Sequence, residues 1–164
     1  MLRDRLERDR LVKGGATPLL LRGFDYWDAL RGGRAMPARA DIDPAAIKPL
    51  LPHVVLMDVL RDADPDWPLD FRYRLIGTQV DAMMNGRYTG LRMSSLPHQR
   101  PPAKIWASLQ RVSEGGEPTV NRVPYIGPHK DYLSVVDVVM PLATDGRTID
   151  MLFCLIEFVP RQPR

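Results

Sequence analysis

Cysteine is almost absent from this sequence, which has only Cys154 among its 164 residues. A single cysteine excludes an internal disulfide framework and any CxxC zinc site. Its position in the apolar run LFCLIEF predicts a buried, unreactive thiol. The histidines, His53, His98 and His129, have no HxxxH or HExxH spacing, so we expect no metal site.

Long apolar runs are also missing. The most apolar segment, residues 151–156, is followed at once by Glu157, far short of the roughly 18 apolar residues that a membrane helix needs. The N-terminus, MLRDRLERDRLVK, has acidic residues throughout and no apolar core, so we expect neither a signal nor a transit peptide. These absences predict a cytoplasmic protein that does not span a membrane.

Charge of one sign never accumulates, because the net charge is +3 and no block of five like charges occurs. We therefore expect no nucleic-acid partner. Ser134, Asp137 and His129 are the residue types of a hydrolase triad, but the sequence has no GxSxG motif. We expect no catalytic residues and no enzymatic activity.

Proline, by contrast, is abundant, with 16 residues that divide the chain into short elements. Thr17 and Pro18 predict the start of a helix, and Gly32 and Gly33 predict its end. The pattern indicates a charged tail or helix over residues 1–16 and one domain over 17–160. Within that domain we expect a helix at 17–31, strands at 53–60 and 70–76, short helices, a longer helix at 101–114, and strands at 118–126, 132–142 and 148–159.

The last two predicted strands are apolar on both faces, so both faces of the sheet must be covered. The helices between the second and third strands can cover the inner face. The outer face is left for the 17–31 helix or for a second copy of the chain. Leu20, Phe24 and Trp27 form an apolar stripe on that helix, and we interpret them as a dimer or partner surface.

Three motifs resemble a known family. YWDALRGGRAMPARADIDP (residues 26–44) is similar to the opening of a PAS-like family common in alphaproteobacteria, formerly catalogued as a domain of unknown function. FRYRLIGT (71–78) and GRYTG (86–90) are similar to two later motifs of the same family. The resemblance spans residues 20–158 and implies an α+β fold, with a five-stranded antiparallel sheet, helices inserted between strands 2 and 3, and an N-terminal helix.

The resemblance implies a sensory or interaction module with a pocket between the inner sheet face and the inserted helices. It does not imply a particular ligand. The flavin-adduct NCRFLQ-like motif is absent, and the helix from Pro101 carries no histidine, so we expect neither a flavin adduct nor haem, with His98 the nearest candidate for a haem ligand. Because the sequence ends at Arg164 without an output domain, we expect the signal to pass by association with a signalling protein, and we expect a homodimer.

Candidate ligand-binding residues fall into three groups. Arg74 has the fork-shaped guanidinium that binds a carboxylate or phosphate, but it could instead be a surface arginine or pair internally with Asp58 or Asp137. The apolar candidates could line a pocket or simply fill the core. The polar candidates could close a pocket or protect an edge strand from aggregation. The apolar group is Met83, Met84 and Trp106, and the polar group is Asn121, Arg122 and Tyr125.

Two main functional interpretations follow from these features. The first is a PAS-type sensor that binds a small molecule and acts through protein association. The second is a ligand-free adaptor that uses the same fold only for dimerisation or docking. A cavity of roughly 300 Å³ or more favours the sensor, whereas a core filled by Trp106 and the methionines favours the adaptor. A small enzyme is the third and least supported alternative.

Overall fold

The computed structural model describes residues 2–61 and 64–163, so the first residue of the predicted N-terminal segment lies outside the described residues. Its sheet contains five strands, antiparallel throughout, in the order β2-β1-β5-β4-β3. The strands are β1 (Val54–Leu60), β2 (Asp70–Ile76), β3 (Thr119–Pro124), β4 (Tyr132–Leu142) and β5 (Met151–Pro160). This confirms the predicted fold class and the predicted number of strands.

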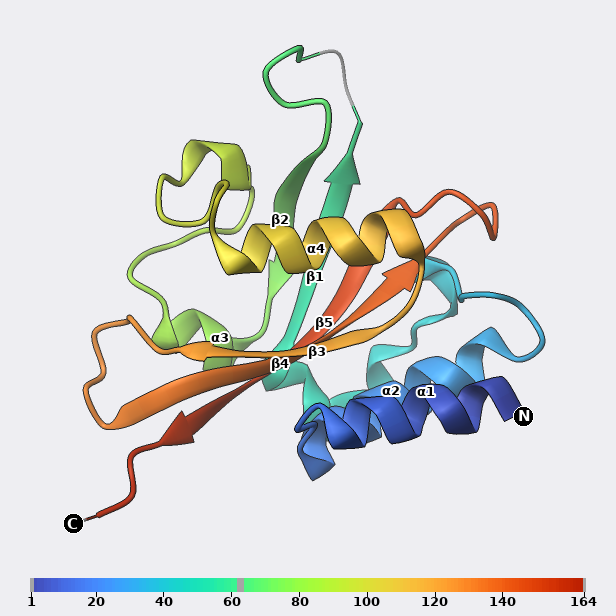
Figure 1. The fold of residues 1–164 in the computed structure, drawn as a ribbon, viewed down its shortest axis with the longest axis horizontal. Coiled ribbons are helices and arrows are strands. Elements are labelled where there is room, and N and C mark those ends of the chain that lie inside the picture. The colour runs from blue at the N-terminus through green and yellow to red at the C-terminus, as the bar shows by residue number, and fades with distance from the viewer. Residues whose placement is uncertain (1, 62–63, 164) are drawn as a thin grey trace.

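The helices are divided between the two faces of the sheet (Figure 1). On the inner face lie α3 (Thr78–Met83), the short η3 (Met93–Ser95) and α4 (Lys104–Gly115), all inserted between β2 and β3 as predicted. The N-terminal helices α1 (Leu2–Lys13) and α2 (Pro18–Arg31) lie on the opposite side. Two 3-10 helices, η1 (Arg39–Asp41) and η2 (Pro44–His53), connect α2 to β1.

Helix α2 begins where the sequence predicts, because the Thr17 side chain accepts a hydrogen bond from the Leu20 backbone nitrogen and Pro18 occupies the first turn. It ends at Gly32, whose φ of 56° is easily adopted only by glycine. Helix α4 starts later than predicted, at Lys104. Pro102 disfavours helical geometry at the residue before it, so Pro101 and Pro102 lie in a turn.

The predicted dimer stripe on α2 requires a correction. Leu20, Phe24 and Trp27 are at most 1% exposed and pack within the chain's own core. The Trp27 indole nitrogen donates a hydrogen bond to the Pro141 carbonyl of β4 at 2.9 Å. The sequence left two alternatives for the outer face, the 17–31 helix or a second copy of the chain. In the structure the helix covers this face, so these three side chains are not available to a partner.

The charged N-terminal segment forms a helix that packs on α2 rather than a free tail. Leu11 of α1 is buried, and Glu7 reaches the buried guanidinium of Arg31 at 2.6 Å. Arg31 also lies 2.8 Å from both Asp4 and Asp28, and its guanidinium stacks 4.5 Å from the centre of the Trp27 ring. A cluster of buried charge therefore joins α1 to α2.

Candidate functional site

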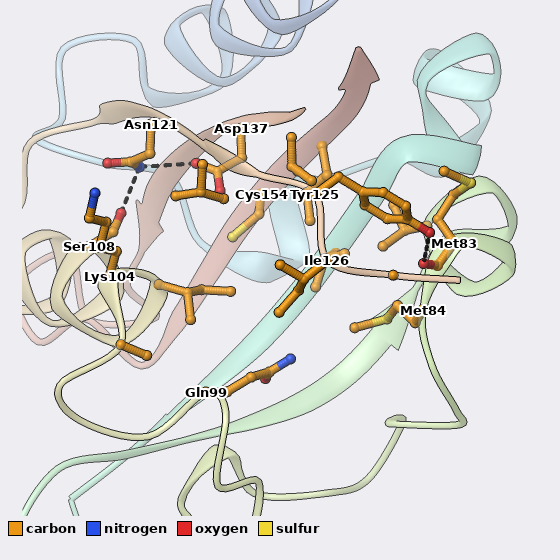
Figure 2. A pocket seen from close by; sticks show the side chains of 18 of the residues that line it. Met83, Met84, Gln99, Lys104, Ser108, Asn121, Tyr125, Ile126, Asp137 and Cys154 are labelled. Atoms are coloured by element: carbon orange, nitrogen blue, oxygen red, sulfur yellow. Dashed lines mark hydrogen bonds between the residues drawn. The ribbon is translucent and has the colours of Figure 1, made fainter. Parts of the chain in front are cut away.

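A cavity of about 570 Å³ lies between the inner face of the sheet and the helices α3 and α4 (Figure 2). Alternate residues of β1, β4 and β5 point into it, because side chains on a strand alternate between the two faces. Its walls are mainly apolar. They are formed by Val55, Met57, Val139, Ile156 and Phe158 from the sheet, and by Val80, Met83, Ile105 and Leu109 from the helices.

One wall of the cavity is polar. Asn121 on β3 is paired directly with Asp137 on β4, and its amide nitrogen donates to Asp137 Oδ1 at 3.0 Å (Figure 2). The same nitrogen donates to the Ser108 hydroxyl of α4 at 2.6 Å. The side chain of Asn121 therefore joins the sheet edge to the helix that covers it and fixes the orientation of the Asp137 carboxyl.

Burial raises the pKa of Asp137 to about 6, although the hydrogen bond from Asn121 acts in the opposite direction. On the neighbouring strand β5, Cys154 also lines the cavity, and burial together with the charge of Asp137 raises the pKa of its thiol. Cys154 therefore stays a protonated thiol at neutral pH. This agrees with the predicted buried, unreactive cysteine.

A second polar group comes from the loop before α4. The Tyr73 hydroxyl of β2 donates to Gln99 Oε1 at 2.6 Å, and both side chains are buried. Burial raises the pKa of Tyr73, so this phenol stays protonated and remains a donor. With Oε1 occupied, the Gln99 amide nitrogen is turned toward the cavity (Figure 2).

The loop between β3 and β4 borders the cavity and is tied to α3. The Tyr125 hydroxyl donates to the Met83 carbonyl at 2.8 Å, and His129 Nε2 lies 2.9 Å from the Ala82 carbonyl. Between them, Ile126 lines the cavity although it is 74% exposed. Two hydrogen bonds therefore hold this border of the cavity in place.

Five of the seven predicted ligand-binding residues line this cavity: Met83, Met84, Asn121, Arg122 and Tyr125. Arg122 lies at the exposed border, where its guanidinium donates to the Ser134 hydroxyl at 3.1 Å. His98 also lines the cavity, with Nε2 3.4 Å from the Tyr88 hydroxyl.

The other two predicted residues do not line the cavity. The Trp106 ring packs edge-on against Phe71 at 5.1 Å and belongs to the core, which was the alternative interpretation of this residue. The Arg74 side chain is 63% exposed and lies 4.0 Å from Asp58, one of the two pairings considered from the sequence. The register of β2 places Arg74 outside the cavity, whereas Tyr73, one residue earlier, faces it.

Sequence reasoning did not select Asp137, Gln99 or Ser108 as binding residues. For Asp137 a signal existed, because it is a lone carboxylate inside the run VVDVV, on a strand that is apolar on both faces. A charge in such a strand is costly unless it has a function or a partner. Gln99 and Ser108 carried no comparable signal, since both residue types are common in loops and on helix surfaces.

Neither a metal centre nor a membrane span is found in the described ranges. Across residues 2–61 and 64–163, no three His, Cys, Asp or Glu side chains gather as metal ligands. No helix in that part of the chain is long and apolar enough to cross a bilayer.

Comparison with known proteins identifies the family of this chain. A family model described as PAS domain matches residues 17–156, most of the chain. The chain therefore belongs to the PAS domain family, and it is a sensory-type module. No curated protein sequence matches it. A solved structure of a fungal LOV domain photoreceptor is similar, with a TM-score of 0.48 and 17% identity, covering 85% of this chain and 91% of that chain.

Proposed function

We propose that this PAS domain is a cytoplasmic sensor that binds a small, largely apolar molecule in the cavity and reports its presence to a signalling protein. The observation that carries the proposal is the cavity itself. Its volume of about 570 Å³ falls within the range of roughly 300–1,000 Å³ that is usual for small-molecule sites. Apolar walls with a few fixed polar groups are also typical of such sites.

The ligand-free adaptor is less well supported. That alternative expects Trp106 and the methionines to fill the space between helices and sheet. Instead, Trp106 packs with Phe71 and Trp67 outside the cavity, and Met83 and Met84 form part of the cavity wall. Open space beside a well-packed core costs stability, because the lining atoms lose van der Waals contacts. A ligand would restore those contacts.

An enzymatic role is not part of the proposal. The residue types of a hydrolase triad occur in the chain, but each one has a different partner. Ser134 accepts from Arg122, Asp137 accepts from Asn121, and His129 contacts the Ala82 carbonyl. A nucleophile and base within hydrogen-bond reach are the minimum for such chemistry.

Signal output by association requires that the ligand favour one of two conformations of a surface. The border between the β3–β4 loop and α3 is our candidate, because the Tyr125–Met83 hydrogen bond lies at both the cavity and the surface. A signalling partner, or a second copy of the chain, would bind at this border, since the stripe on α2 is buried. To shift the equilibrium between the two conformations of this border, the ligand must bind them with different affinities.

Native mass spectrometry of the purified protein tests the proposal, since it reports bound molecules and oligomeric state together. We expect a retained small molecule, or one taken up from a fragment library, that is lost on denaturation. Ile156→Phe places a larger side chain in the cavity and should prevent binding. Leu133→Phe is the matched control, because Leu133 is exposed and does not line the cavity. Failure of every compound to bind wild-type protein would contradict the proposal.

A further inference from the structure

Asp137 lines the cavity with one carboxylate oxygen that accepts no hydrogen bond from the described residues. Oδ1 accepts from Asn121, and Oδ2 has no hydrogen-bond partner among the described residues. Oδ2 is not fully enclosed by protein atoms, and Asp137 lines the cavity, so this oxygen faces the open space. A carboxylate in such a position is available to a ligand.

Within residues 2–61 and 64–163, no positive side chain forms an ion pair with Asp137. Besides Asp137, the ionisable groups that line the cavity are Lys104 of α4, Tyr88 and His98 between β2 and α4, Arg122 of β3, Tyr125 after β3, Tyr73 of β2 and Cys154 of β5. Lys104 and Arg122 are exposed at the border, and neither forms an ion pair with Asp137. In the described part of the chain, the hydrogen bond to the Asp137 carboxylate comes from the neutral amide of Asn121.

A desolvated carboxylate without a counter-ion is unfavourable, and a cation or a strong donor placed beside it relieves the cost. We infer, on the premise of the proposed function, that the ligand carries a nitrogen donor group, preferably a cation such as an amine or amidine, directed at Asp137. The rest of the molecule is a compact apolar body that contacts Met57, Leu109 and Ile156. In this arrangement Asp137 selects the charge of the ligand. The cavity walls bind its apolar body.

Four probes of similar shape separate charge selection from cavity filling: 4-methoxybenzamidine, 4-methoxybenzamide, 4-methoxybenzoate and 4-methoxytoluene. Titration followed by protein NMR gives the affinity of each. We expect the amidine to bind at least about tenfold more tightly than the amide, because a charge-assisted hydrogen bond is roughly twice as strong as a neutral one. The benzoate should bind most weakly.

Asp137→Asn should remove the preference for the amidine while it leaves binding of 4-methoxytoluene unchanged. Asp131→Asn, the same substitution at an exposed loop position, is the control and should keep the preference. Amidines stay protonated in this range, so the pH dependence reports the ionisation of Asp137. With a pKa of about 6, Asp137 is mostly protonated at pH 5 and mostly ionised at pH 7.5. Amidine binding should therefore be about tenfold weaker at pH 5 than at pH 7.5. His98→Gln should retain this pH dependence, which shows that it does not come from the histidine.

The outcomes distinguish the two proposals. Equal affinity for amidine and amide, or a preference for benzoate, overturns the inference about ligand charge and leaves the sensor proposal intact if 4-methoxytoluene binds. A pH dependence that disappears in His98→Gln also overturns the inference. If none of the four probes binds to wild-type protein, the cavity is not a binding site for molecules of this class, and both proposals are contradicted.

Discussion

The guanidinium of Arg31 lies 2.6 Å from the carboxylate of Glu7, and the two side chains are only 2% and 5% exposed. This ion pair joins α1, which precedes the matched PAS region, to α2, which covers the outer face of the sheet. Breaking a buried pair from one side leaves an uncompensated charge, which costs far more than the loss of a surface pair.

Arg31→Leu should therefore destabilise the protein by about 3 kcal/mol, the usual cost of leaving one partner of a buried pair uncompensated. Urea unfolding measures the loss, and hydrogen exchange should show that residues 2–13 lose protection first. Arg8→Leu is the matched control. Its partner Asp25 is half exposed, so we expect a change below about 1 kcal/mol. Equal effects of the two substitutions would contradict a buried role for Arg31.

Much of this fold follows from local sequence signals. Thr17-Pro18 and Gly32 mark the ends of α2 because helix capping and a positive φ depend on single residues. The strands around Val136 and Leu155 are recognisable because they are apolar on both faces, and both residues are fully buried. Such signals do not depend on the rest of the fold.

The site was less predictable because it depends on strand faces and on packing between distant elements. Tyr73 and Arg74 are neighbours in the sequence, but only Tyr73 faces the cavity, and a shift of one residue in register would exchange them. The stripe of Leu20, Phe24 and Trp27 correctly indicates an apolar face. The stripe alone does not say whether that face meets the same chain or another one.

Asp137→Asn should stabilise the protein at pH 8. The folded-state pKa of about 6 lies above the ordinary value of 3.8, so ionised Asp137 opposes folding at every pH above about 6. At roughly 1.4 kcal/mol per pKa unit, the difference corresponds to about 3 kcal/mol.

As pH falls from 6 toward 4, Asp137 becomes protonated in the folded protein and the free energy of unfolding of wild type increases. The difference between Asp137→Asn and wild type should then largely disappear. Thermal or urea unfolding at pH 8 and pH 4 measures it, with Asp131→Asn as a control that we expect to show little difference from wild type at both values. A stabilisation of Asp137→Asn that is the same at both pH values would contradict the raised pKa.

Tyr125→Phe should loosen the border between the β3–β4 loop and α3. The substitution removes only the hydroxyl that donates to the Met83 carbonyl, so we expect a loss of about 1 kcal/mol and faster amide exchange in residues 125–131. Tyr132→Phe is the control, because the Tyr132 ring lies 6.0 Å from that of Tyr125 and its hydroxyl forms no hydrogen bond among the described residues.

Gly127→Ala tests the same border by a different route. A Cβ at Gly127 would clash with the Tyr125 ring and come within 2.6 Å of the Met83 carbonyl oxygen, so the loop must move away from α3. We expect faster exchange over residues 125–131, as in Tyr125→Phe, and faster ligand release in both variants. Unchanged release rates would show that this border does not control access to the cavity.

Asn121→Leu should raise the pKa of Asp137 above about 6. The hydrogen bond from the Asn121 amide lowers this pKa, and its removal leaves the effect of burial unopposed. Carboxyl carbon chemical shifts followed by NMR through a pH titration measure the change. In Arg74→Gln, the substitution lies on an exposed residue outside the cavity, so the pKa of Asp137 should stay at its wild-type value. If the pKa of Asp137 is the same in Asn121→Leu and in wild type, the Asn121 amide does not orient the Asp137 carboxyl. The selectivity inferred for a donor group on the ligand would then depend on Asp137 alone.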